Sequence, residues 1–155
     1  MEFIRPISIL KYQTISCRFS SDTFKPNGKG ISIFAKNCAM QSSGSICNHI
    51  SLYYQSTVKQ PPLFCIIDSV YLLTQIGFEE AKIEPTDGGN GDLCHYDVFD
   101  SKRKGQESFA KDFFKPNNIY KCINGNSSLV SNDELSFFYN SYINKIQQDI
   151  NNNLF

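Results

Sequence analysis

Near the start of the chain, apolar and polar residues alternate with the period of two that is typical of β-strands. In the second such run, Ile15, Cys17 and Phe19 share one face, and Arg18 lies on the opposite, polar face. Shorter apolar runs farther along, bounded by proline or glycine, predict further strands, of which residues 63–67 read as a central strand buried on both faces. The predicted strands cover residues 3–10, 12–19, 31–34, 63–67 and 93–99.

Apolar positions spaced three and four residues apart predict helices elsewhere in the chain. The clearest helix begins at Ser131-Asn132-Asp133-Glu134, a capping box in which the serine hydroxyl and the glutamate carboxylate satisfy free amides at the helix start. Its apolar stripe runs from Leu135 to Ile150. Another start signal is Asp68 or Ser69, directly after an apolar run. The predicted helices cover residues 42–54, 69–76, 101–114 and 131–150.

These elements predict an α+β fold with a mixed or antiparallel sheet flanked by helices. The 155 residues are close to the usual size of one domain, and we find no internal repeat and no linker long enough to divide them. We therefore expect a single globular domain over residues 1–155, with a core formed by residues 3–123 and an amphipathic C-terminal helix over 131–150.

The charge of the chain argues against two classes of partner. Fifteen Lys and Arg residues balance fifteen Asp and Glu residues, so no global field draws the protein to nucleic acid or to an anionic membrane. No apolar run approaches the roughly 20 residues that a membrane span needs. We expect neither nucleic acid nor a membrane as a partner, and any phosphate-bearing ligand must be bound by a local patch.

The six cysteines include no Cys-x-x-Cys pair, and three of them lie in apolar runs where a free thiol packs as a small buried hydrophobe. The N-terminal residues lack the basic start and the uninterrupted apolar segment of a signal peptide. We therefore expect reduced cysteines and a cytoplasmic protein.

Three segments of the sequence carry a resemblance. Residues 18–26 read Arg-Phe-Ser-Ser-Asp-Thr-Phe-Lys-Pro, residues 30–33 read Gly-Ile-Ser-Ile, and residues 94–98 read Cys-His-Tyr-Asp-Val. This order resembles a set of small bacterial proteins that pair an R-x-S-S-x-x-F-x-P segment with L-S-V and a later H-A-x-V. The chain departs from that pattern at Tyr96, where a small residue is usual.

The resembling segments also contain the candidate site, in which we expect a guanidinium and an imidazole to meet over one hollow. Arginine suits a diphosphate, hydroxyl groups complete an anion cradle, and a histidine can move a proton. An arginine, a serine-bearing strand and an acidic residue are similar to the arrangement by which ADP-ribosyltransferase folds bind NAD. The predicted site has His95 and Arg18 as catalytic residues and Ser20, Ser21, Ser32 and Asp97 as ligand-binding residues.

Other interpretations of these residues stay open. The acid of such a mechanism would be Asp97, Glu107 or Glu134, and no spacing selects one of them. The serine-rich segment also fits a structural turn, because serine and aspartate side chains bond nearby backbone. His95 and Asp97, with His49 as a distant third, form an incomplete ligand set, so we expect no metal. Cys38 as a nucleophile lacks any recognisable signature.

Two functions follow as expectations. In the first, the chain is a small intracellular bacterial effector or toxin-like domain that acts on a nucleotide or another small anionic ligand, with NAD as the candidate cofactor. In the second, it is a non-catalytic module whose aromatic C-terminal helix docks a protein partner or a second copy. The sequence leaves open whether the protein is an enzyme.

Overall fold

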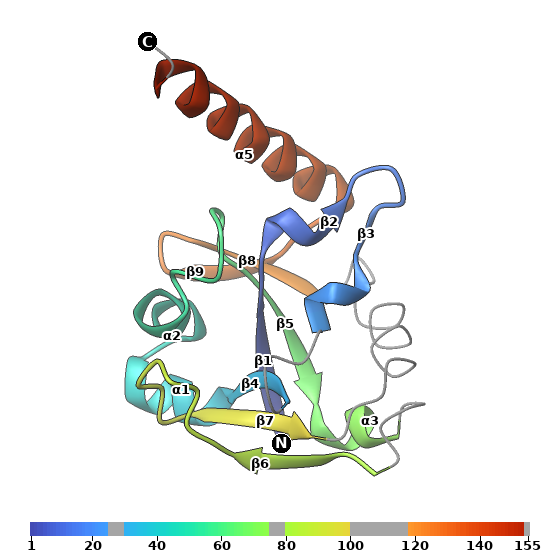
Figure 1. Cartoon of the computed structure of the whole chain (residues 1–155). Helices are drawn as coiled ribbons and strands as arrows, with labels where there is room; N and C mark the ends of the chain where they lie inside the picture. The colour runs from blue at the N-terminus through green and yellow to red at the C-terminus, as the bar shows by residue number, and fades with distance from the viewer. Residues whose placement is uncertain (25–29, 75–79, 100–117, 154–155) are drawn as a thin grey trace.

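A computed structural model describes residues 1–24, 30–74, 80–99 and 118–153 of the chain. They fold around an antiparallel sheet of seven strands in the order β6-β7-β4-β1-β5-β8-β9, while β2 and β3 form a separate two-stranded sheet (Figure 1). Helices flank the large sheet, so the predicted α+β class and single domain are confirmed. The helix predicted over 101–114 lies outside the described residues.

The strands are β1 (Glu2–Ile7), β2 (Tyr12–Gln13), β3 (Arg18–Phe19), β4 (Ile31–Ala35), β5 (Leu63–Asp68), β6 (Lys82–Pro85), β7 (His95–Phe99), β8 (Ile119–Ile123) and β9 (Asn126–Leu129). The α-helices are α1 (Lys36–Ser43), α2 (Ile46–Tyr53), α3 (Ser69–Leu73) and α5 (Asn132–Asn153), and the 3-10 helices are η1 (Ile9–Lys11) and η2 (Ser21–Phe24).

The strand predicted over 12–19 is instead a hairpin, and that prediction was wrong. Tyr12 pairs with Phe19, both are buried, and the chain reverses between them. Cys17 makes this turn with a φ of 53°, which lies in the left-handed region, and Ile15 is fully exposed at the tip. A tight hairpin keeps the alternation of apolar and polar positions, so the pattern alone did not reveal the reversal.

The structure has two helices, α1 and α2, where one helix was predicted over residues 42–54. The first of them begins six residues before the predicted start. α1 starts at Lys36, directly after β4, and ends at Ser43. Gly44 caps this end with a φ of 82°, which is readily adopted only by glycine. Ser45 then caps α2 by accepting a hydrogen bond from the Asn48 amide. The Ser-Gly-Ser sequence therefore ends one helix and begins the next.

The central strands of the large sheet are covered on both faces. The prediction that residues 63–67 form a central strand is confirmed, because β5 lies between β1 and β8. One face packs against α1 and α2 through residues such as Ile4, Phe34 and Ile50. The other face packs against the β2–β3 hairpin and the first turns of α5.

The predicted capping box at the start of α5 is confirmed. The Ser131 hydroxyl accepts a hydrogen bond from the Glu134 amide at 3.2 Å, and the Glu134 carboxylate accepts one from the Ser131 amide at 3.4 Å. Lys121 of β8 also bonds Glu134 and is the main reason why the pKa of this carboxyl lies below its usual range. Among the described helices, none combines the length and apolar character required to cross a bilayer.

The expectation of reduced cysteines is contradicted by two disulfides. Cys38 pairs with Cys94, and Cys47 pairs with Cys122, each with a Cα–Cα distance of 5.6 Å. The first bond joins α1 to the residue before β7, and the second joins α2 to β8. The paired cysteines are 56 and 75 residues apart, so no local spacing motif in the sequence could indicate the pairing. Cys17 and Cys65 are free.

Peptide mapping of the non-reduced protein should recover both linked pairs, with Cys17 and Cys65 as free thiols. Replacing Cys47 and Cys122 together by alanine should lower the free energy of unfolding by about 2–4 kcal/mol, because a long loop in the unfolded chain loses its cross-link. Urea denaturation measures this loss.

The matched control is the Cys65→Ala variant, which removes a buried thiol without removing a bond. Recovery of all six cysteines as thiols from protein prepared without reductant, or of a different pairing, would contradict the disulfide assignment.

Candidate functional site

The candidate site lies where β1 and β4 separate. The β1–β4 ladder has two residue pairs and ends at Ile4 opposite Phe34, whereas the β1–β5 ladder has six pairs. Arg5 is the next residue of β1, and its Nη1 donates a hydrogen bond of 2.6 Å to the Ser32 carbonyl of β4. The guanidinium thus supplies a donor to a β4 carbonyl beyond the end of the ladder.

The same guanidinium holds the turn that leads toward β4. Its Nε and Nη2 donate to the Thr23 carbonyl at 3.2 and 2.7 Å. Thr23 is buried, and its own hydroxyl donates to the Ser20 carbonyl at 2.8 Å. Arg5 therefore joins β1, η2 and β4 through one side chain.

A cavity of about 310 Å³ opens beside this junction. Its wall comes from β1, β4, the C-terminal end of α2 and the loop that precedes β7. This volume lies at the lower end of the roughly 300–1,000 Å³ that is usual for small-molecule sites. The lining side chains used below are Arg5, Ser32, Tyr53, Tyr54, Asn90 and His95.

The guanidinium brings a positive charge to this cavity, and none of the hydrogen bonds it makes to described residues has a carboxylate as acceptor. Three of its five N–H groups are used in the hydrogen bonds to Ser32 and Thr23, and both acceptors are neutral carbonyls. No carboxylate of the described residues forms an ion pair with Arg5. Burial lowers the pKa of Arg5, yet an arginine keeps its proton in proteins. The negative charge of Asp97 acts on Arg5 without a hydrogen bond and raises its pKa, which opposes the effect of burial. The N–H groups that the described carbonyls do not use favour an anion in the cavity.

His95 is held in a defined orientation at the same cavity. Its Nδ1 lies 2.8 Å from the Thr86 hydroxyl, and that hydroxyl donates to the Asp97 carboxylate at 2.7 Å. A hydroxyl has one proton, so Thr86 must accept from Nδ1–H. Neutral His95 then has its lone pair on Nε2, for which no described residue provides a hydrogen bond.

Gly88 allows the loop before β7 to lie against the imidazole. A Cβ atom at this position would come within 2.7 Å of Cδ2 and 2.9 Å of Nε2 of His95. Such contacts are closer than atoms tolerate, so any side chain at residue 88 would displace the loop or the ring. The glycine thus sets how closely the cavity wall approaches His95.

The structure brings together three of the six residues of the predicted site. Ser32 and His95 line the cavity, and the Ser32 hydroxyl donates to Asp97 at 3.4 Å. Arg18 does not line it: this side chain is exposed on β3, opposite Gln13 of the small sheet. The expected convergence of Arg18 with His95 is therefore absent from this cavity, and Arg5 supplies the guanidinium there.

The serine-rich segment forms a turn beside the cavity. The Ser20 amide donates to the Lys11 carbonyl, and the Ser20 carbonyl accepts from Thr23. Ser20 lines a separate, more open hollow next to the β2–β3 hairpin. Ser21 begins η2, and its side chain lies outside the described part of the structure. These contacts agree with the structural interpretation of the segment that the sequence left open.

Sequence reasoning missed Arg5 and Thr86. The available signal for Arg5 was a charged residue in the middle of the apolar run from residue 3 to residue 10, followed by a proline. Thr86 stands in a glycine-rich loop, where a threonine is unremarkable. Both acquire their importance from partners 9 to 27 residues away in the chain.

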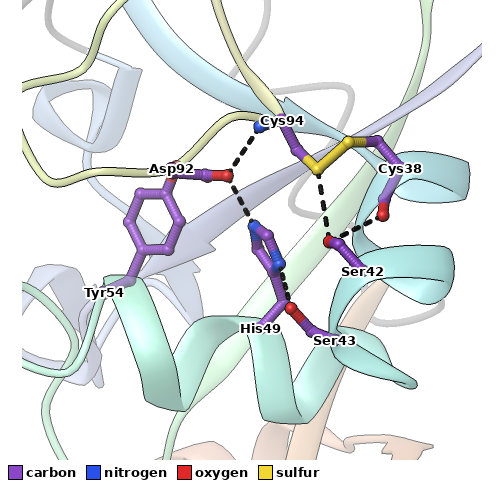
Figure 2. The surroundings of a disulfide bond; sticks show 7 residues. All are labelled: Cys38, Ser42, Ser43, His49, Tyr54, Asp92 and Cys94. Carbon is purple, nitrogen blue, oxygen red and sulfur yellow. Dashed lines mark hydrogen bonds and ion pairs between the residues drawn. A yellow bond between two sulfur atoms is a disulfide. The ribbon is translucent and has the colours of Figure 1, made fainter.

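A second polar cluster is buried beneath α1 and α2. The Asp92 carboxylate accepts hydrogen bonds from His49 Nε2 at 2.9 Å, from the Tyr54 hydroxyl at 2.6 Å and from the Cys94 amide at 2.8 Å. Ser43 lies 2.7 Å from the other imidazole nitrogen (Figure 2). Burial raises the pKa of Asp92, but these hydrogen bonds outweigh it and leave that pKa below its usual value. Burial also raises the pKa of Tyr54.

The order of hydroxyl, imidazole and carboxylate in this cluster is that of a nucleophilic triad, but its surroundings are not. The His49 side chain is 1 % exposed and packs between the rings of Phe34 and Tyr53, with centroid distances of 4.6 and 4.8 Å. Ser43 does not line the cavity. Cys38, the other candidate nucleophile, forms a disulfide and has no thiolate. We assign the cluster no hydrolytic role.

Neither a scan against protein-family models nor searches of curated proteins and of solved structures found a match to this chain. The resemblance to small bacterial proteins therefore stays a prediction from the motifs alone.

Proposed function

We propose that the chain binds a small anionic organic ligand, of mononucleotide size, in the cavity between β1 and β4. The observation that carries the proposal is the Arg5 guanidinium, which lines the cavity and has neutral carbonyls as its hydrogen-bond acceptors. A phosphate or carboxylate group in the cavity supplies negative charge, and its oxygen atoms accept hydrogen bonds from the remaining N–H groups of Arg5.

The dimensions of the cavity support one nucleotide rather than two. About 310 Å³ is near the lower limit for ligand pockets, whereas the NAD predicted from the sequence needs room for a dinucleotide. Tyr53 and Tyr54 give the wall an aromatic surface, on which a base can stack. NAD or ADP-ribosyl chemistry is thus the less favoured form of the proposal.

His95 supplies acid–base chemistry in this proposal. Its Nε2 lone pair accepts a proton from a ligand hydroxyl, while Thr86 and Asp97 hold the ring and stabilise the imidazolium that forms. Arg5 takes the anion-binding role that was predicted for Arg18. The predicted role as a bacterial effector or toxin-like enzyme is the biological setting of this chemistry and rests on the sequence alone.

The disulfides bear on where the protein functions. Two disulfides persist most readily in an oxidising compartment, so they favour such a compartment over the predicted cytoplasm.

Titration calorimetry with AMP and ADP tests the ligand. We expect millimolar or tighter binding to the wild-type protein, and a loss of about tenfold or more, or about 1.4 kcal/mol, in His95→Asn. In this variant the asparagine amide still offers an N–H group to the Thr86 hydroxyl, as Nδ1 of His95 does, but the Nε2 atom is lost. Arg18→Ala is the matched control, because its side chain lies outside the cavity and its loss should leave the affinity unchanged.

The proposal fails if neither nucleotide binds, or if Arg18→Ala weakens binding while His95→Asn does not. Both variants must melt within a few degrees of the wild-type protein, so that a loss of binding does not reflect unfolding. Chromatographic detection of nicotinamide release from NAD tests the ADP-ribosyl form separately.

The shape of α5 favours a second candidate function, docking through the C-terminal helix. Leu135 is buried and Phe138, Tyr139 and Tyr142 pack against the core, so the first part of the predicted stripe belongs to the fold. The remainder projects away from the sheet (Figure 1), and Ile150 at its far end is 54 % exposed. An apolar stripe that continues beyond the body of the protein fits a second copy of the same helix.

Light scattering on a size-exclusion column tests this function. We expect the wild-type protein to form a concentration-dependent dimer that Ile150→Asp weakens, because a carboxylate would be buried in the interface. Gln148→Asp, on the opposite side of α5, adds the same charge and should leave the dimer intact. A wild-type protein that stays monomeric at all concentrations contradicts self-association through α5.

A further inference from the structure

The Cys38–Cys94 disulfide lies beside two groups that bind metals. His49, Asp92 and Cys94 each offer one ligand atom, and these three atoms all lie within 4.8 Å of one another. All three residues are buried. Figure 2 shows His49 and Asp92 next to the sulfur of Cys94, with Cys38 bonded to that sulfur from α1. In the oxidised protein both sulfurs are occupied by their mutual bond.

We propose that reduction of the Cys38–Cys94 disulfide creates a buried zinc site whose four ligands are Cys38, Cys94, His49 and Asp92. Two thiolates, one imidazole and one carboxylate match the donor atoms and the closed tetrahedral arrangement of protein zinc sites. This inference goes beyond the proposed ligand cavity and does not depend on it.

For three of the four ligands the required shifts are small. Zinc–ligand bonds of about 2.0–2.3 Å place tetrahedral ligand atoms roughly 3.3–3.8 Å apart. Among His49, Asp92 and Cys94, the most distant pair of ligand atoms must approach by about 1 Å. His49 Nε2 and Asp92 Oδ1 are 2.9 Å apart and must separate slightly. Once the S–S bond is broken, the two sulfurs can move apart by side-chain rotation while their Cα atoms stay near 5.6 Å.

The groups around these ligands already hold them in place. The Ser43 hydroxyl lies 2.7 Å from His49 Nδ1, and it can accept Nδ1–H when Nε2 binds metal. The Tyr54 hydroxyl donates to the second oxygen of Asp92. Metal-binding imidazoles and carboxylates usually have such hydrogen-bond partners, which fix their orientation.

The chemistry balances in two steps. A phosphine reductant gives two electrons to the S–S bond, two protons from water complete the thiols, and the phosphine becomes its oxide. Zinc then binds two thiolate sulfurs, His49 Nε2 and one Asp92 oxygen. The two thiol protons leave to solvent, and the Nε2 proton moves to Nδ1. One Zn²⁺ enters as two H⁺ leave, so the buried cluster keeps the same net charge.

Cobalt titration of the phosphine-reduced protein tests the site, because Co²⁺ reports thiolate ligands by charge-transfer absorption and tetrahedral geometry by its visible bands. Every protein in the series carries Cys17→Ser to remove the exposed thiol. Burial raises the pKa of Cys65, which is free in the oxidised protein, to about 12. Reduction also frees Cys47 and Cys122, which the variants below address. We expect one Co²⁺ per reduced chain, displaced by Zn²⁺, and no binding to the oxidised protein.

Two double variants form the matched pair. Replacing Cys38 and Cys94 by serine should abolish the charge-transfer bands, whereas replacing Cys47 and Cys122 by serine should leave them. If the reduced protein unfolds without metal, we expect Zn²⁺ to restore its circular dichroism in the second variant and not in the first. The proposal is overturned if the reduced wild-type protein binds no Co²⁺ at micromolar concentrations, if both variants bind alike, or if Zn²⁺ fails to restore an unfolded reduced chain.

Discussion

The arrangement of this protein depends on the contact between the Arg5 guanidinium and the Ser32 carbonyl. The β1–β4 ladder ends before Ser32, so without Arg5 the Ser32 carbonyl would lose this hydrogen bond. Leaving a buried carbonyl without a hydrogen bond costs about 1–3 kcal/mol. The same guanidinium ties the Thr23 turn to the sheet. The same Arg5 guanidinium therefore stabilises the place where β1 and β4 separate and lines the cavity that opens there.

The buried cluster under α1 and α2 positions the opposite wall of that cavity. Tyr54 lines the cavity, and its hydroxyl donates a hydrogen bond to Asp92, so the end of α2 is fixed to the loop before β7. The Cys38–Cys94 disulfide fixes α1 to the same loop. His95 directly follows Cys94, and a change in the redox state of the disulfide is therefore expected to reach the cavity wall through one residue.

Local patterns predicted a large part of the fold, because local interactions set it. The capping box at Ser131, the Asp68 helix cap and the central β5 strand follow from neighbours within a few residues. The hairpin within residues 12–19 and the helix break at Gly44 are local features that the patterns did not resolve, whereas the disulfides depend on distant partners. Nothing near Cys38 identifies Cys94 as its partner, and nothing near Arg5 reveals that β4 ends its pairing there. The motifs selected Ser32 and His95, which line the cavity, and Asp97, which contacts Ser32. They selected Arg18, which does not line it, and not Arg5, which does.

NMR spectra of the arginine side-chain N–H groups, recorded during a titration with AMP, test the central claim most directly. An anion bound by the Arg5 guanidinium should shift the Arg5 signals progressively and leave those of the exposed Arg18 unchanged. Saturable AMP binding that shifts Arg18 and leaves Arg5 unaffected would contradict the account and would restore the site predicted from the sequence.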